Sequence, residues 1–129
     1  MNYFFAVLPA AYIFGIFFFA DSQVVSQIAV FNPFSLLHIP LYGILTLLLV
    51  LALGPRSATN SKFRYTLAAL IAVAVALVDE FYQSFIPSRE GSITDVLLDV
   101  LGVSLALFLS LRGPFSHWTT RFQKITKCG

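Results

Sequence analysis

Four apolar stretches, each close to the length that crosses a lipid bilayer, restrict the folds that this chain can adopt. A transmembrane α-helix needs about 20 consecutive, mostly apolar residues. The four stretches run over residues 3–20, 34–53, 65–84 and 93–111, and shorter, less apolar segments separate them. The pattern predicts an all-α, integral membrane four-helix bundle.

Composition supports this fold class. Hydrophobic residues make up 58% of the 129 positions and charged residues 11%, and 14 residues are Phe. A single soluble core of this size could not bury so much apolar surface. No basic residue precedes the first stretch, so we expect a retained helix rather than a cleaved signal. The single cysteine, Cys128, has no disulfide partner within the chain.

Basic residues predict the orientation of the bundle. One group of Lys and Arg lies between the second and third stretches, and another follows the fourth. Residues 21–33 contain neither, and residues 85–92 contain one Arg balanced by one Glu. By the positive-inside rule both termini are expected to be cytoplasmic. We expect a transmembrane domain over residues 1–112 and, over 113–129, a basic amphipathic cytoplasmic tail, although an ordinary basic tail explains the same residues.

Acidic residues interrupt the apolar pattern where the third stretch ends and the fourth begins. Residues 79–99 read DEFYQSFIPSREGSITDVLLD, and ionisable groups at membrane depth are costly and usually functional. From the helical rise, Asp79 and Glu80 lie roughly 5 to 10 Å below the outer helix end and Asp99 roughly 10 Å below it. His38 opens the second helix on the same side. The sequence therefore predicts an outward-facing polar pocket.

Spacing within the fourth helix places three residues on one face. Asp95, Asp99 and Gly102 fall at i, i+4 and i+7, and the glycine would let a neighbouring backbone approach closely. Ser92 and Asp95 also resemble a capping box, so Asp95 has an alternative role as a helix N-terminal charge. That role cannot explain Asp99, which lies one turn deeper.

The other helices offer similar pairs. Gln83 borders both Asp79 and Glu80 on the third helix, whereas His38 and Tyr42 are four residues apart on the second. A proline between His38 and Tyr42 leaves their local geometry open.

The roles of Arg89 and His38 remain open. Arg89 in the outer turn could neutralise nearby acids in an ion-pair network, grip a phosphate or carboxylate, or do both. His38 could be an interfacial hydrogen-bonding residue or a ligand-binding one.

The pattern of these residues extends over almost the whole chain. It comprises Ser22-Gln23, His38, Tyr42, Asp79-Glu80, Gln83, Pro87-Ser88-Arg89, Ser92, Asp95 and Gly102. In this pattern the chain resembles the VanZ-like family of small bacterial membrane proteins. It departs from the family at Ser88 and Glu90, where Gly and Ser are frequent, and at Asp99, where Asn is common. The resemblance implies a location in the cytoplasmic membrane of a bacterium and a link to resistance against glycopeptide antibiotics such as teicoplanin.

Three functions are compatible with the predicted pocket. The first is binding of a membrane lipid or a lipid-linked cell-wall precursor. The second is enzymatic, with a carboxylate acting as general base on a lipid-linked substrate. The third, ion or proton transport, is disfavoured because the fourth helix offers only two serines beyond Gly102 and the second offers only one threonine beyond Tyr42. No nucleic-acid-binding signal is present, and the oligomeric state is left open.

The candidate residues divide into two groups. The candidate catalytic residues are Asp79, Glu80 and Asp95, and the candidate substrate-binding residues are His38, Tyr42, Gln83, Arg89 and Asp99. The acids and the histidine could also ligate Mg²⁺, Mn²⁺ or Zn²⁺. Because no helical ligand motif such as HExxH is present, the sequence assigns no metal site, and it leaves the cofactors open.

Overall fold

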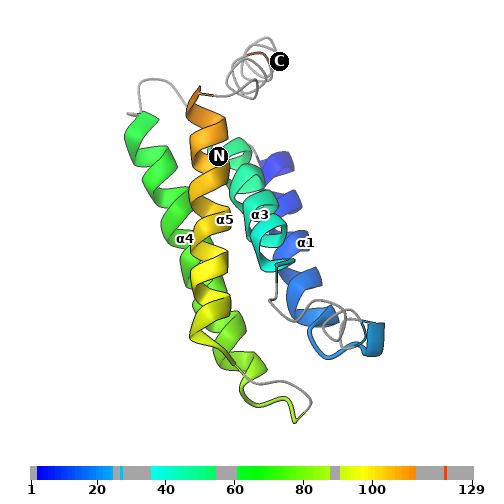
Figure 1. Ribbon diagram of the computed structural model, residues 1–129. Helices are drawn as coiled ribbons and strands as arrows, with labels where there is room; N and C mark the ends of the chain where they lie inside the picture. Colours follow the sequence, from blue (N-terminus) through cyan, green and yellow to red (C-terminus); the bar gives the residue numbers. More distant parts are fainter. Residues whose placement is uncertain are drawn as a thin grey trace.

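The computed structural model describes residues 3–24, 27, 36–54, 61–87, 91–112 and 121. Within this part of the chain the regular secondary structure is entirely helical, which confirms the all-α prediction. Figure 1 shows the four helices, which are α1 (Tyr3–Phe19), α3 (His38–Ala52), α4 (Ser61–Gln83) and α5 (Ile93–Arg112).

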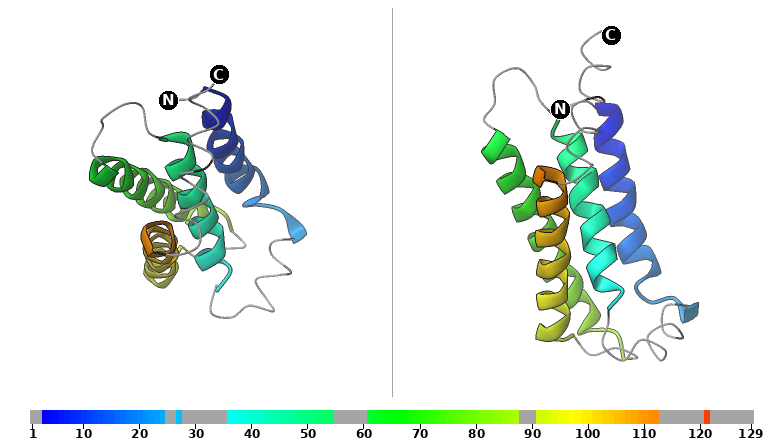
Figure 2. Two further views of the ribbon diagram at one scale, coloured as in Figure 1. Left: turned by 90° about the horizontal axis from the view of Figure 1, so that it is seen from above. Right: turned by 45° about the horizontal axis from the view of Figure 1, so that its top comes forward.

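The helices run alternately up and down, with α3 in contact with all the others (Figures 1 and 2). Its most extensive packing is against α5, and α1 packs mainly against α3. The start of α3, the end of α4 and the start of α5 meet at one end of the bundle, which we call the turn end because the α4–α5 connection lies there. Residues far apart in sequence are brought together at this end.

Two helix boundaries differ from those that hydropathy predicts. Helix α3 begins at His38, after a turn at Leu36 and Leu37, rather than at residue 34. Pro40 explains the late start, because proline is tolerated in a first turn, whose N–H groups have no intrahelical partner, but not in a helix interior. Helix α4 begins at Ser61, one turn before the apolar stretch. Hydropathy marks the apolar part of a helix and omits a polar first turn.

Two of the four helices are long and apolar enough to cross a membrane. These spans are Lys62–Gln83 and Ile93–Arg112, whereas the apolar parts of α1 and α3 are shorter. Large apolar side chains such as Phe14, Leu70 and Phe108 point outward from the bundle. The bundle therefore exposes a large apolar surface in addition to its buried core.

Small residues bring the helices together in the core. Ala68, Ala72 and Ala76 recur every fourth residue on the face of α4 that packs inward, and all three are fully buried. Such a row of small side chains lets a neighbouring helix approach closely.

The closest approach between helices is that of α3 and α5 at Gly102. A Cβ atom there would overlap the Ile39 carbonyl oxygen and lie 3.0 Å from its carbonyl carbon. On the facing helix, a Cβ at Gly43 would lie 3.4 Å from the Gly102 carbonyl oxygen. The prediction that Gly102 admits a neighbouring backbone is therefore confirmed.

Candidate functional site

Polar and ionisable side chains gather at the turn end of the bundle. We call this group the polar cluster; its members are His38 and Tyr42 of α3, Asp79 and Glu80 of α4, and Asp95 and Asp99 of α5. Four of them are buried, with His38 and Asp95 partly exposed. Three helices thus contribute side chains to one cluster.

The polar cluster continues the buried face of each helix. On α4 the row that contains Ala72 and Ala76 leads into Asp79 and Gln83, because steps of three or four residues stay on one side of a helix. One buried stripe is therefore apolar over most of its length and polar at the turn end. This position explains how charged groups become buried in a helix whose fully buried apolar residues, among those described, are all alanines.

His38 lies between two acids of α5. Its Nδ1 atom is 2.8 Å from Asp99 Oδ1, and its Nε2 atom is 4.0 Å from Asp95 Oδ2. The imidazole ring is nearly parallel to the Tyr42 ring, with an interplanar angle of 10° and centroids 6.3 Å apart. The close crossing of α3 and α5 at Gly102 brings His38 and Asp99 within hydrogen-bonding distance.

Asp79 and Glu80 are neighbours in sequence but have different partners. The Tyr42 hydroxyl donates a hydrogen bond of 3.0 Å to Asp79 Oδ2, inside the bundle. The backbone N–H of Ser92 donates one of 2.8 Å to Glu80 Oε2, at the α4–α5 turn. Consecutive residues project about 100° apart on a helix with 3.6 residues per turn. Asp79 is therefore tied to α3, and Glu80 to the start of α5.

The turn before α5 is shaped by Gly91. A Cβ atom at this position would lie 2.9 Å from the Glu80 carbonyl oxygen, so a side chain would push the turn away from α4. Ser92 is the N-cap of α5, since its hydroxyl accepts a hydrogen bond of 3.2 Å from the Thr94 N–H. The Ser92 N–H donates to Glu80 rather than to Asp95. The capping-box prediction is therefore wrong for the Asp95 side chain, which instead lies towards α3.

Three buried carboxylate oxygens have no hydrogen-bond partner among the described residues. They are Asp79 Oδ1, Glu80 Oε1 and Asp99 Oδ2. Buried polar atoms are nearly always paired, so unpaired ones call for an explanation. Each of these oxygens retains the capacity to accept a hydrogen bond or to bind a cation.

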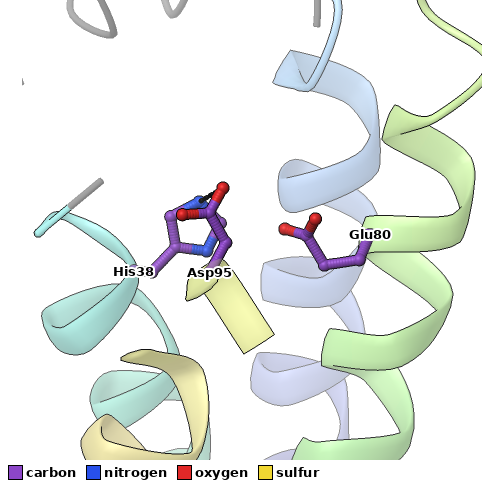
Figure 3. Close-up of side chains that lie close together, drawn as sticks. All are labelled: His38, Glu80 and Asp95. Carbon is purple, nitrogen blue, oxygen red and sulfur yellow. Dashed lines mark ion pairs between the residues drawn. The ribbon is translucent and has the colours of Figure 1, made fainter. Parts of the chain in front are cut away.

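Three residues of the polar cluster have the geometry of a metal-binding group. One ligand atom from each of His38, Glu80 and Asp95 lies within 4.8 Å of the others. Figure 3 shows the Glu80 carboxylate pointing towards the other two side chains, each residue coming from a different helix.

Two further candidate residues, Gln83 and Arg89, were predicted to bind substrate. Gln83 is buried in the last turn of α4, on the face that carries the polar cluster. Arg89 lies outside the described residues. So does the predicted tail over 113–129, except for residue 121.

Sequence reasoning missed one contributor and the way the side chains pair. The missed group is the Ser92 backbone N–H, which binds Glu80; the signal available in the sequence was the Gly-Ser pair that precedes α5. The pairs Tyr42–Asp79 and His38–Asp99 depend on the rotation of one helix against another. Spacing along a single helix does not contain that information.

Charges are separated between the two ends of the bundle. The described acids all lie towards the turn end, namely Asp21, Asp79, Glu80, Asp95 and Asp99. Within the four helices, the described basic residues Lys62, Arg64 and Arg112 lie at the opposite end. Negative charge in the polar cluster is thus not balanced by lysine or arginine from the described helices.

Comparison with known proteins gives one match. A family model described as VanZ/LLP1 matches residues 2–113, a range that contains all four described helices and the whole polar cluster. No curated protein and no solved structure matches the chain.

Proposed function

We propose that this chain, which belongs to the VanZ/LLP1 family, binds a lipid or lipid-linked envelope component through its polar cluster, from the outer side of a bacterial cytoplasmic membrane. The observation that carries the proposal is the set of three buried carboxylate oxygens without a partner among the described residues. Within the described part of the chain, nothing compensates the burial of these oxygens.

Membrane insertion is supported by length and by surface chemistry. Helices α4 and α5 are long and apolar enough to span a bilayer, and large apolar side chains face outward. We propose that α1 and α3 cross beside them, since shorter apolar helices are accommodated by local thinning of the bilayer.

The separation of charges supports the orientation. Lys62, Arg64 and Arg112 lie at the end opposite the polar cluster. Because basic residues favour the cytoplasmic side, the turn end would face outward and both chain termini would lie inside.

The chemistry of the polar cluster selects the class of ligand. Carboxylate oxygens accept hydrogen bonds from hydroxyl and amine groups, which are abundant in glycan and lipid headgroups. His38 and Arg89 would contact the anionic groups that lipid-linked precursors carry. Glycopeptide antibiotics act on such precursors outside the membrane, so binding there would connect the protein to resistance or to envelope maintenance.

A second candidate function is catalysis on the same substrate class. It is favoured by the arrangement of Glu80 and His38, which places a carboxylate oxygen without a hydrogen-bond partner among the described residues near an imidazole. In this alternative a carboxylate acts as general base and a neighbouring group orients it.

Substitution of two acids tests the proposal and separates the alternatives. We expect Glu80→Gln and Asp95→Asn each to weaken binding of a lipid-linked precursor by on the order of tenfold or more, because a hydrogen bond to a charged group contributes about 1.5–3 kcal/mol. Binding would be measured with the purified protein in nanodiscs, and precursor levels and teicoplanin susceptibility would be measured in cells. Asp21→Asn is the matched control, because Asp21 is an exposed acid at the same end but outside the polar cluster.

The outcomes differ for the two functions. Altered drug susceptibility with unchanged lipids supports binding, whereas accumulation or loss of a defined lipid species supports catalysis. If folded and inserted Glu80→Gln and Asp95→Asn proteins match the control in every assay, the polar cluster is not the functional site.

A further inference from the structure

We propose that His38, Glu80 and Asp95 bind a divalent transition-metal cation at the turn end of the bundle. The inference goes beyond lipid binding and does not depend on it. Each of the three residues comes from a different helix, so no local motif in the sequence could reveal the site.

The three ligand atoms are nearly as close to one another as ligands of one metal ion are. They lie within 4.8 Å of one another, and Glu80 points towards the other two side chains (Figure 3). Ligands at about 2.0–2.2 Å from Zn²⁺ are separated from each other by roughly 3.3–3.6 Å in a tetrahedral site. His38 and Asp95 are partly exposed, so small side-chain rotations can close the difference.

Asp99 prepares His38 to act as a ligand. Its Oδ1 atom lies 2.8 Å from His38 Nδ1, and an ionised Asp99 at this distance accepts a hydrogen bond from an Nδ1–H group. In the neutral imidazole the lone pair then belongs to Nε2, which faces Asp95 Oδ2 at 4.0 Å. A metal-binding histidine typically donates its other ring N–H to a carboxylate, a backbone carbonyl or a water, which fixes the ring and its tautomer. A lone pair facing a carboxylate is unfavourable unless a proton or a metal cation lies between them.

Glu80 supplies a second, independent observation. It is only 7% exposed, and its Oε1 atom has no hydrogen-bond partner among the described residues. Its other oxygen is held by the Ser92 N–H, which fixes the direction of the carboxylate. A buried and oriented carboxylate oxygen without a partner is suited to bind a cation.

The donor set and the local charge determine the class of cation. One imidazole nitrogen and two carboxylate oxygens suit Zn²⁺ or Mn²⁺ better than Mg²⁺, which prefers oxygen ligands and retains its waters. The described helices bring no Lys or Arg to this end, so a divalent cation would neutralise the two carboxylates. Two explanations compete with a metal ion: a proton on His38 Nε2 that forms an ion pair with Asp95, and neutralisation of the acids by Arg89, which lies outside the described residues.

Titration with metal ions tests the proposal directly. The full chain, carrying Cys128→Ser to remove its thiol, would be purified in detergent, treated with chelator and titrated with Co²⁺ while visible absorption is recorded. We expect bands that saturate at one ion per chain, displacement by Zn²⁺, and no displacement by an excess of Mg²⁺. Glu80→Gln and Asp95→Asn should weaken Co²⁺ binding by on the order of 100-fold, because loss of even an outer-shell partner costs about 10- to 100-fold.

A control variant and a measurement of folding distinguish loss of metal binding from loss of structure. Asp21→Asn should bind Co²⁺ as the parent does, and circular dichroism would establish that each variant is folded. Absence of saturable Co²⁺ and Zn²⁺ binding by the folded parent overturns the proposal and favours the two competing explanations. Equal binding by the parent and by folded Glu80→Gln and Asp95→Asn also overturns it. Neither result affects the lipid-binding test, whose readout is a different ligand.

Discussion

Introducing a single methyl group at Gly102 is expected to lower the free energy of unfolding by about 3 kcal/mol, the upper end of the range for overpacked cores. A Cβ there would overlap the Ile39 carbonyl oxygen. The obstacle is backbone rather than a flexible side chain, so α3 and α5 must separate. The separation would also lengthen the hydrogen bond between His38 and Asp99. Equilibrium unfolding of Gly102→Ala in mixed detergent micelles would measure the loss.

Gly15 provides the matched control for this substitution. It also lies inside a helix, α1, but nothing lies within 4 Å of the position where its Cβ would be. Gly15→Ala should therefore be neutral or stabilising by about 0.5–1 kcal/mol, since alanine has the higher helix propensity. Equal stability of Gly102→Ala and Gly15→Ala would show that α3 and α5 do not meet as described.

Removal of the Tyr42 hydroxyl is expected to cost about 2–3 kcal/mol, because it leaves a buried, charged acceptor without a partner. The hydroxyl donates to Asp79 Oδ2, and both side chains are at most 1% exposed. The other oxygen of Asp79 already has no partner among the described residues. Tyr42→Phe removes one atom and preserves the packing of the ring, so denaturation of this variant reports mainly on the lost hydrogen bond.

Two further variants isolate the contribution of Asp79. Thr46→Val also removes a fully buried hydroxyl from α3, but this hydroxyl donates to a carbonyl of its own helix, so we expect a loss below about 1 kcal/mol. Combining Tyr42→Phe with Asp79→Leu should recover most of the lost stability, because both polar partners are then gone. A double variant as unstable as the sum of the single ones would contradict the pairing.

Several features of the fold and of the polar cluster could be predicted from the sequence because they follow from periodicity. Asp95, Asp99 and Gly102 share one face of α5 and Gly102 admits the backbone of α3, as the i, i+4, i+7 spacing indicated. The ends of α1 and α5 lie within one residue of the limits set by hydropathy. These properties depend on one helix at a time.

What could not be predicted depends on how helices are rotated and placed against each other. Asp79 and Glu80 were treated as a pair beside Gln83, yet one binds Tyr42 and the other the Ser92 N–H. Asp95 had a capping role as an alternative to a role in the pocket, but the Ser92 N–H that a capping box requires is bound to Glu80. A hydrogen bond from a backbone N–H, such as that of Ser92, cannot be predicted from the spacing of side chains along the sequence.

Thiol labelling on intact cells tests most directly the central claim, that the polar cluster lies at the outer face of the membrane. A cysteine would be introduced at Pro87 beside the cluster or at Lys62 at the opposite end, both exposed, in a chain carrying Cys128→Ser. With any outer membrane permeabilised, an impermeant maleimide should label Pro87→Cys on intact cells and Lys62→Cys only after lysis. Labelling of Lys62→Cys on intact cells with protection of Pro87→Cys would place the polar cluster on the cytoplasmic side and contradict the account.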